Sequence, residues 1–157
     1  MEFHTIFKKT LLFLIILFII SNCKDNIMTE KVKNLDDFEE IISETYIENL
    51  TIIDDTVNCI RLYGNDEWVD NINDTIIEKV IYLKNKYKTN WKKFDKNNYA
   101  EIHVKKSCYR LHSQGEGNIV SSGKIIRPEF YLYCTKGTAN INIELDCNFL
   151  EIETHSG

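Results

Sequence analysis

The spacing of the apolar residues changes near Tyr99, and this change limits the folds that the chain can adopt. After Tyr99, apolar and polar residues alternate, as in a strand with one buried face. We therefore predict half-buried antiparallel strands in this part of the chain, with a short hairpin turn at Lys136-Gly137. The apolar positions of these strands are Ala100, Ile102, Val104, Cys108, Phe130, Leu132, Cys134, Ala139, Ile141, Ile143, Leu145 and Cys147.

Before Tyr99, apolar residues recur every three or four positions, which is typical of amphipathic helices. Residues 35–50 have this spacing, with Asn34 available as an N-cap. Residues 65–88 have it again, with acidic residues at the start and lysines at the end, as a helix dipole favours. This second stretch can form one helix or two. Residues 57–63 are rich in β-branched and apolar side chains and predict a short strand, with a continuation of the preceding helix as the alternative.

Helices that precede strands along the chain indicate an α+β fold. We expect two or three N-terminal helices packed on one face of a three- to five-stranded, mainly antiparallel sheet. The 157 residues are enough for one domain with a substantial core. We place this domain at residues 35–157.

An export signal begins the chain. Lys8 and Lys9 precede an unbroken apolar run, Leu11–Ile20, which is followed by Ser21 and Asn22. This order of basic, apolar and small or polar residues is that of a secretory signal. A bilayer span needs about 20 apolar residues, so the run is too short to cross a membrane permanently. We predict that residues 1–22 are an export signal peptide.

The end of the apolar run, Ile20-Ser21-Asn22-Cys23, resembles the lipobox of bacterial lipoproteins, in the relaxed form of spirochaete lipoproteins. In that family the cysteine thiol is acylated and the cysteine becomes the new N-terminus. The resemblance implies lipidation of Cys23, a membrane anchor of acyl chains, and a polar tether at residues 23–34. It places the protein in the bacterial cell envelope, in a leaflet that the sequence does not specify. The alternative is an ordinary cleaved signal and a secreted protein.

Four cysteines remain beyond Cys23: Cys59, Cys108, Cys134 and Cys147. An even number of cysteines in an exported protein is compatible with two disulfides, and three pairings are open. The alternative is four reduced thiols that pack as small hydrophobic side chains. No Cys-x-x-Cys spacing occurs, so the sequence lacks the signature of a thioredoxin-type redox centre or a zinc ribbon.

A basic stretch near residue 90 interrupts a chain whose net charge is -5. Lys84, Lys88 and Lys92 would form one ridge on a continued helix, with Lys93 beside them. Such a ridge could contact sulfated glycan, anionic lipid headgroups or nucleic acid. The alternative is a solvated helix end whose neighbouring aromatic residues belong to the core. The acidic balance argues against a dedicated DNA-binding protein, so we expect no specific nucleic-acid partner.

The sequence contains no Walker loop, GxGxxG, GxSxG, HExxH or EF-hand loop. His103 and His112 are nine positions apart and would face opposite ways on one strand, so we expect no shared metal site. We predict no catalytic residue, no metal and no cofactor. The sequence favours a non-catalytic domain that binds a protein or a polyanionic partner. Two alternatives are an inhibitor or immunity-type lipoprotein and a small envelope hydrolase or isomerase with a dispersed site.

Overall fold

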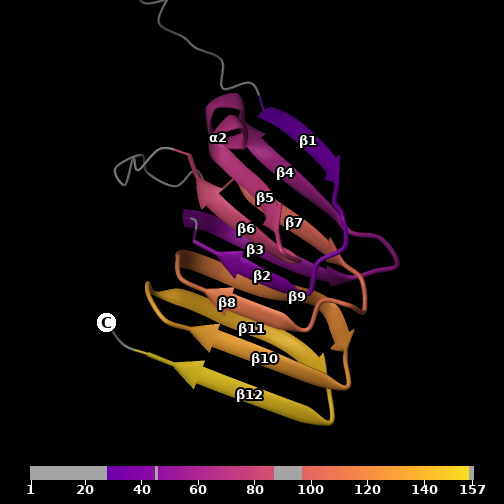
Figure 1. Cartoon of the computed structure of the whole chain (residues 1–157). Coiled ribbons are helices and arrows are strands. Elements are labelled where there is room, and N and C mark those ends of the chain that lie inside the picture. The colour runs from indigo at the N-terminus through magenta and orange to yellow at the C-terminus, as the bar shows by residue number, and fades with distance from the viewer. Residues whose placement is uncertain (1–27, 45, 87–96, 156–157) are drawn as a thin grey trace, which may run out of the picture.

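The computed structural model describes residues 28–44, 46–86 and 97–155, which lie mostly in strands (Figure 1). Within these ranges the one helix is the six-residue α2 (Asp66–Asn71). No helix in the described ranges is long and apolar enough to cross a membrane. The strands are β1 (Met28–Asn34), β2 (Glu40–Ser43), β3 (Tyr46–Asp54), β4 (Cys59–Asn65), β5 (Ile72–Ile77), β6 (Val80–Asn85), β7 (Tyr99–Val104), β8 (Arg110–Ser113), β9 (Glu116–Ile126), β10 (Glu129–Cys134), β11 (Ala139–Asp146) and β12 (Phe149–Thr154).

These strands form two six-stranded sheets that enclose a common core. Sheet A has the order β1-β4-β7-β3-β9-β11, and sheet B has the order β12-β10-β8-β2-β6-β5. From β7 onward the chain passes alternately through the two sheets. The strands β8, β10 and β12 are parallel neighbours in sheet B, and β9 and β11 are parallel neighbours in sheet A. The C-terminal half is therefore a parallel β-solenoid, in which each passage through both sheets adds a coil.

The two ends of the solenoid differ. At the N-terminal end, β4 and β1 run antiparallel in sheet A and β5 runs antiparallel to β6 in sheet B. Helix α2 lies at this end, where it contacts β1, β4 and β5 (Figure 1). Its Val69 side chain is buried, and Asn65 caps it by accepting a hydrogen bond from the Trp68 N–H. At the C-terminal end the described strands stop at β11 and β12, and β12 is exposed along its whole length.

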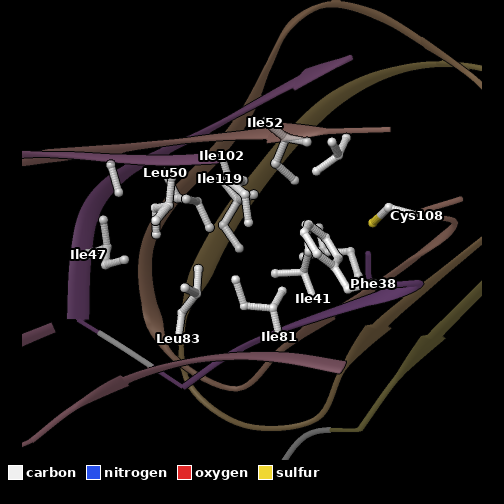
Figure 2. Close-up of a cluster of buried hydrophobic side chains, with 14 of the residues drawn as sticks. Phe38, Ile41, Ile47, Leu50, Ile52, Ile81, Leu83, Ile102, Cys108 and Ile119 are labelled. Atoms are coloured by element: carbon white, nitrogen blue, oxygen red, sulfur yellow. The ribbon is translucent and has the colours of Figure 1, made fainter. Parts of the chain in front are cut away.

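Side chains from both sheets fill the space between them (Figure 2). Alternation along each strand sends every second residue inward, and most of these residues are isoleucine or leucine. β-Branched side chains favour the extended backbone, so the same residues support the strands and fill the core. Core residues at most 4% exposed include Phe38, Ile41, Leu50, Ile52, Ile81, Leu83, Ile102, Leu111 and Ile119.

The α+β prediction is wrong, because the predicted N-terminal helices are mostly strands. Residues 35–50 contain β2 and the start of β3 instead of a helix. In β2, Ile41 and Ser43 are buried while Glu40 and Ile42 are less so, which is a period of two. A short segment with isoleucines on both faces fits a helical and an extended spacing almost equally well. The partner strands on both sides, β6 and β8, decide in favour of the extended form.

Within the described residues 65–86, the helix predicted at residues 65–88 is limited to α2. It is followed by a hairpin of β5 and β6, which pair antiparallel over six residues each. Glu78 and Lys79 connect them, with φ values of 50° and 65°. Two consecutive positive φ values are typical of a two-residue turn whose twist matches the flanking strands. The wide apolar stripe of this segment therefore reflects one helical turn followed by two strands.

The strands predicted after Tyr99 are present as β7, β10 and β11, although Cys108 and Cys147 lie outside them, and their antiparallel arrangement is wrong. Residues 136 and 137 do not close a hairpin, because β10 belongs to sheet B and β11 to sheet A. They form a corner between the sheets, at which Gly137 has a φ of 82°. The short strand predicted at residues 57–63 is present as β4, which begins at Cys59.

Part of the predicted polar tether lies inside the folded domain. Residues 28–34 form β1, and all seven pair with residues of β4. The Lys33 ammonium lies 3.0 Å from a carboxylate oxygen of Asp74 in β5, so an ion pair connects the edge strands of the two sheets. The described fold thus starts at Met28, seven residues earlier than the sequence suggested.

Candidate functional site

The outer face of sheet B carries a cluster of aromatic side chains. Along β10, Phe130 is buried and faces the core with Leu132, so Tyr131 and Tyr133 emerge on the opposite face. We call this surface the tyrosine face. It comprises Glu40, Tyr109, Arg110, His112, Tyr131, Tyr133, Thr135, Phe149, Glu151 and Glu153.

Strand register places these side chains in rows across the sheet. Tyr131 is aligned with Arg110 of β8 and with Glu151 of β12, and Arg110 is aligned with Glu40 of β2. Two residues further along, His112, Tyr133 and Glu153 form the next row. Parallel, in-register coils therefore bring together side chains that are far apart in the sequence.

Tyr131 is the centre of the ring cluster. Its ring lies 6.5 Å from the ring of Tyr133, with an angle of 20° between the planes, and 6.1 Å from Tyr109 at 64°. The Phe149 ring is 5.8 Å away on the β12 side. His112 adds an edge contact to Tyr133 at 5.9 Å. These separations are within the usual range for interacting aromatic side chains.

Arg110 joins the ring cluster to the acidic side chains. Its guanidinium lies 5.0 Å from the Tyr109 ring centre and 5.7 Å from that of Tyr131, within the range of cation–π contacts. The same group lies 3.3 Å from a carboxylate oxygen of Glu40 and donates to the Tyr109 hydroxyl. Arg110 is therefore held in place by neighbours on three sides.

The two central phenols stay protonated well above neutral pH. Burial raises the pKa of Tyr131 and of Tyr133, and the carboxylates of Glu129 and Glu151 raise them further. Tyr131 donates to Glu129 at 3.3 Å and Tyr133 donates to Glu151 at 3.4 Å. Both hydroxyls thus remain neutral hydrogen-bonding groups beside carboxylates.

A shallow depression of about 450 Å³ lies on the tyrosine face, and its size falls in the usual range for ligand sites. The His112 Nε2 atom bonds the Thr135 hydroxyl at 2.7 Å, and Gln114 contacts the same imidazole. The depression thus combines aromatic surface with hydrogen-bond donors and acceptors. It is lined by Glu40, Arg110, His112, Tyr131, Tyr133, Thr135 and Glu153.

The structure separates the two histidines considered in the sequence. His103 lies on β7 of sheet A and bonds Asp55 at 2.8 Å, whereas His112 lies on β8 of sheet B. The described residues contain no group of three or more His, Cys, Asp or Glu side chains able to hold a metal ion. Asp54, the neighbour of Asp55 in the sequence, pairs with Arg127.

Of the four lysines predicted to contact a polyanion, the structure describes Lys84. It lies on β6, 3.0 Å from a Glu44 carboxylate oxygen and 4.7 Å from the Tyr82 ring centre. The helical ridge assumed for it does not exist here, because the segment is a strand. Lys88, Lys92 and Lys93 lie outside the described residues, as does Cys23, so polyanion contact and lipidation stay predictions.

The four remaining cysteines are free thiols, so the two predicted disulfides are not found in the structure. Cys134 ends β10, whereas Cys147 follows β11, which returns along the other sheet to the start of β10. The six residues of β10 therefore separate Cys134 from Cys147 by roughly 20 Å. Disulfides need Cα atoms within about 7 Å, so this pairing is excluded in the described fold.

We expect Cys108 to be the least reactive of the described thiols. It is 3% exposed, and burial raises its pKa to about 12. At pH 8 the reactive thiolate is then about one part in ten thousand. Native alkylation at pH 8 should modify Cys108 at least about 100-fold more slowly than Cys134, which is partly exposed.

Peptide mass spectrometry with and without urea would measure these rates. Urea without reductant should make all four thiols reactive. Equal native rates at Cys108 and Cys134 would contradict the buried position of Cys108, and thiols that react only after reduction would reinstate the disulfides.

The tyrosine face was not predicted from the sequence. The alternation that places Phe130 and Leu132 on one face of a strand also implies that Tyr131 and Tyr133 share the other. The missing information was which strands lie beside β10, because that depends on the coiling of the chain.

Solved structures of other proteins have the same fold. The chain is similar to a "putative adhesin" from Bacteroides fragilis, with a TM-score of 0.74, 17% identity, and coverage of 83% of this chain and 59% of that one. A "putative lipid binding protein" from Parabacteroides distasonis gives a TM-score of 0.58 at 11% identity, with 83% and 68% covered. A "putative adhesin" from Parabacteroides merdae gives 0.56 at 13%, with 82% and 59% covered.

At these identities the likeness shows the fold alone. The chain also spans about three fifths of the length of the two proteins named adhesins. No protein-family model matches the sequence, and no curated protein matches it.

Proposed function

We propose that this chain is a lipid-anchored, extracytoplasmic binding protein that holds its partner on the tyrosine face. The lipobox-like sequence that ends at Cys23 supports export and anchoring. Proteins with the same fold carry names that refer to adhesion or lipid binding, which supports a binding role. The aromatic rings and hydrogen-bonding groups of the tyrosine face offer a surface for such a contact.

One observation carries the binding proposal: the grouping of Tyr131 and Tyr133 with Arg110 and His112 on the outer face of a sheet. Outward-facing positions of a half-buried strand are ordinarily polar, since they meet water. Tyrosine and arginine are instead the residue types enriched at the centres of binding surfaces. A depression lies at the same place, so a partner would have both a recess and aromatic surface to contact.

The anchor would hold the domain near the membrane. With β1 starting at Met28, four residues separate it from Cys23. Four extended residues reach at most about 14 Å. Two or three acyl chains on Cys23 would give a stable attachment, whereas one chain binds marginally.

We expect Cys23→Ser to release the protein from the membrane. In detergent phase separation the wild-type chain should enter the detergent phase. Cys23→Ser in a chain without residues 1–22 should enter the aqueous phase, because both the acylated thiol and the apolar run are absent. Intact mass of the wild-type chain should show a diacylglyceryl or triacyl N-terminus at Cys23. Cys59→Ser is the matched control, since Cys59 lies on the outer face of sheet A, and should stay in the detergent phase. An unmodified wild-type N-terminus would overturn the anchor.

The binding role can be tested with liposomes that carry the full lipidated chain. The liposomes are passed over three immobilised surfaces: a neutral polysaccharide, heparin and collagen. Retention on at least one surface should be lost in the double variant Tyr131→Ala/Tyr133→Ala. The matched control is Tyr63→Ala/Tyr99→Ala, which removes a stacked pair, 5.0 Å apart, from sheet A. Retention that is equal in both double variants, or absent on all surfaces, would overturn the proposal.

A further inference from the structure

We infer that the tyrosine face binds a neutral oligosaccharide, a proposal that rests on the binding function proposed above and names its ligand. Three features of this face favour such a ligand: the spacing of its aromatic rings, the polar groups beside them and the balance of charge around them.

The aromatic surface has a repeat set by the strand. Tyr131 and Tyr133 are two positions apart on β10, and their nearly parallel rings have centres 6.5 Å apart, which is about the rise of two strand residues. The surface thus offers two aromatic rings in succession along the strand. Aromatic ring faces carry partial negative charge, so they attract the weakly positive C–H groups on one side of a sugar ring. A chain of sugar units can contact both tyrosines.

Polar groups flank the rings on both sides. On the β8 side lie Arg110 and His112, and on the β12 side lie Glu151 and Glu153. Thr135 closes one end of the depression through its bond to His112. Carboxylates accept hydrogen bonds, guanidinium donates them, and hydroxyls and imidazole do both. Sugar hydroxyls also donate and accept, so they match this mixture better than a ligand with one kind of group.

The charges beside the rings favour a neutral ligand over an anionic one. The depression is lined by two carboxylates, Glu40 and Glu153, and by one permanent cation, Arg110, which is already paired with Glu40. A sulfated chain would meet an excess of negative charge here. A cationic ligand would compete with Arg110, whose guanidinium already lies near the rings of Tyr109 and Tyr131.

The liposome experiment is extended with free competitors, using linear hexasaccharides of glucose, mannose or N-acetylglucosamine. We expect retention on the neutral polysaccharide, and its loss when at least one neutral hexasaccharide is added. The Tyr131→Ala/Tyr133→Ala variant should bind that hexasaccharide at least about tenfold more weakly, as expected when two aromatic contacts are removed. Tyr63→Ala/Tyr99→Ala should bind it as the wild-type chain does. Urea unfolding of each variant verifies that it is folded.

The other outcomes separate the two proposals. Tyrosine-dependent retention on heparin or collagen, without retention on the neutral polysaccharide, would overturn the saccharide inference and leave the binding function standing. Retention that does not depend on the two tyrosines would overturn both. Tyr133→Phe adds a further check, because it keeps the ring and should keep most of the saccharide affinity.

Discussion

Replacing Arg127 with alanine is expected to lower the free energy of unfolding by about 3–5 kcal/mol, because it leaves buried polar groups without partners. The Arg127 side chain is 1% exposed and pairs with Asp54 at 2.8 Å. It also donates to three backbone carbonyl oxygens, those of Lys105, Cys108 and Ile126, at 2.7–2.8 Å. One side chain therefore links the connection between β7 and β8 to the connection between β9 and β10.

Urea unfolding of the full chain would measure this loss. Arg61→Ala is the matched control, because Arg61 is 43% exposed and pairs with Glu30 and Glu101 at the surface. Exposed pairs of this kind contribute about 0–1 kcal/mol, so the control should change little. Equal effects of the two substitutions would contradict the structural role given to Arg127.

A second large effect is expected for Phe38→Ala. Phe38 is completely buried just before β2, next to Ile41 (Figure 2). Removing a buried phenylalanine ring leaves a cavity and costs about 3–5 kcal/mol of unfolding free energy. Thermal or urea unfolding would measure the loss.

Phe149→Ala provides the comparison, since Phe149 is 50% exposed on β12. Its effect on stability should stay within about 0.5 kcal/mol. A small effect of Phe38→Ala would mean that residues 35–39 pack less tightly on the core than the structure has them.

The sequence allowed correct prediction of β7, β10 and β11, but not of β8, β9 and β12, nor of how the strands are arranged. Alternation of residues such as Ile141 with Asn142 reveals a strand and its buried face. The alternation does not show whether a strand pairs with the next strand in the sequence or with the second next. In this fold β10 lies beside β8 and β12, and β9 and β11 are in the opposite sheet. That choice depends on how the coils stack, which is a property of the whole chain.

The N-terminal half misled for a different reason. Between residues 35 and 50 the side chains of Phe38, Ile41 and Ile42 satisfy a helical stripe. Isoleucine is β-branched, however, and β-branched residues lose side-chain freedom in helices. The spacing of the apolar residues thus favoured a helix, whereas the propensity of the isoleucines favoured a strand. Pairing with the neighbouring strands gave the strand.

A row of asparagines also depends on how the coils stack. Asn49, Asn118 and Asn140 are far apart in the sequence, but their side-chain amides form a ladder of 3.3 Å hydrogen bonds across three coils.

The position of β1 has a mechanical consequence. As the edge strand of sheet A, β1 pairs with β4 alone in that sheet, through seven residue pairs. With the acyl anchor proposed at Cys23, a load on a bound partner would travel through the solenoid and leave it through β1. A pull along the strand would strain the seven pairs together, whereas a pull across it would open them one after another. The lifetime of the folded protein under force would then depend on whether the force acts along β1 or across it, and not only on the affinity of the tyrosine face.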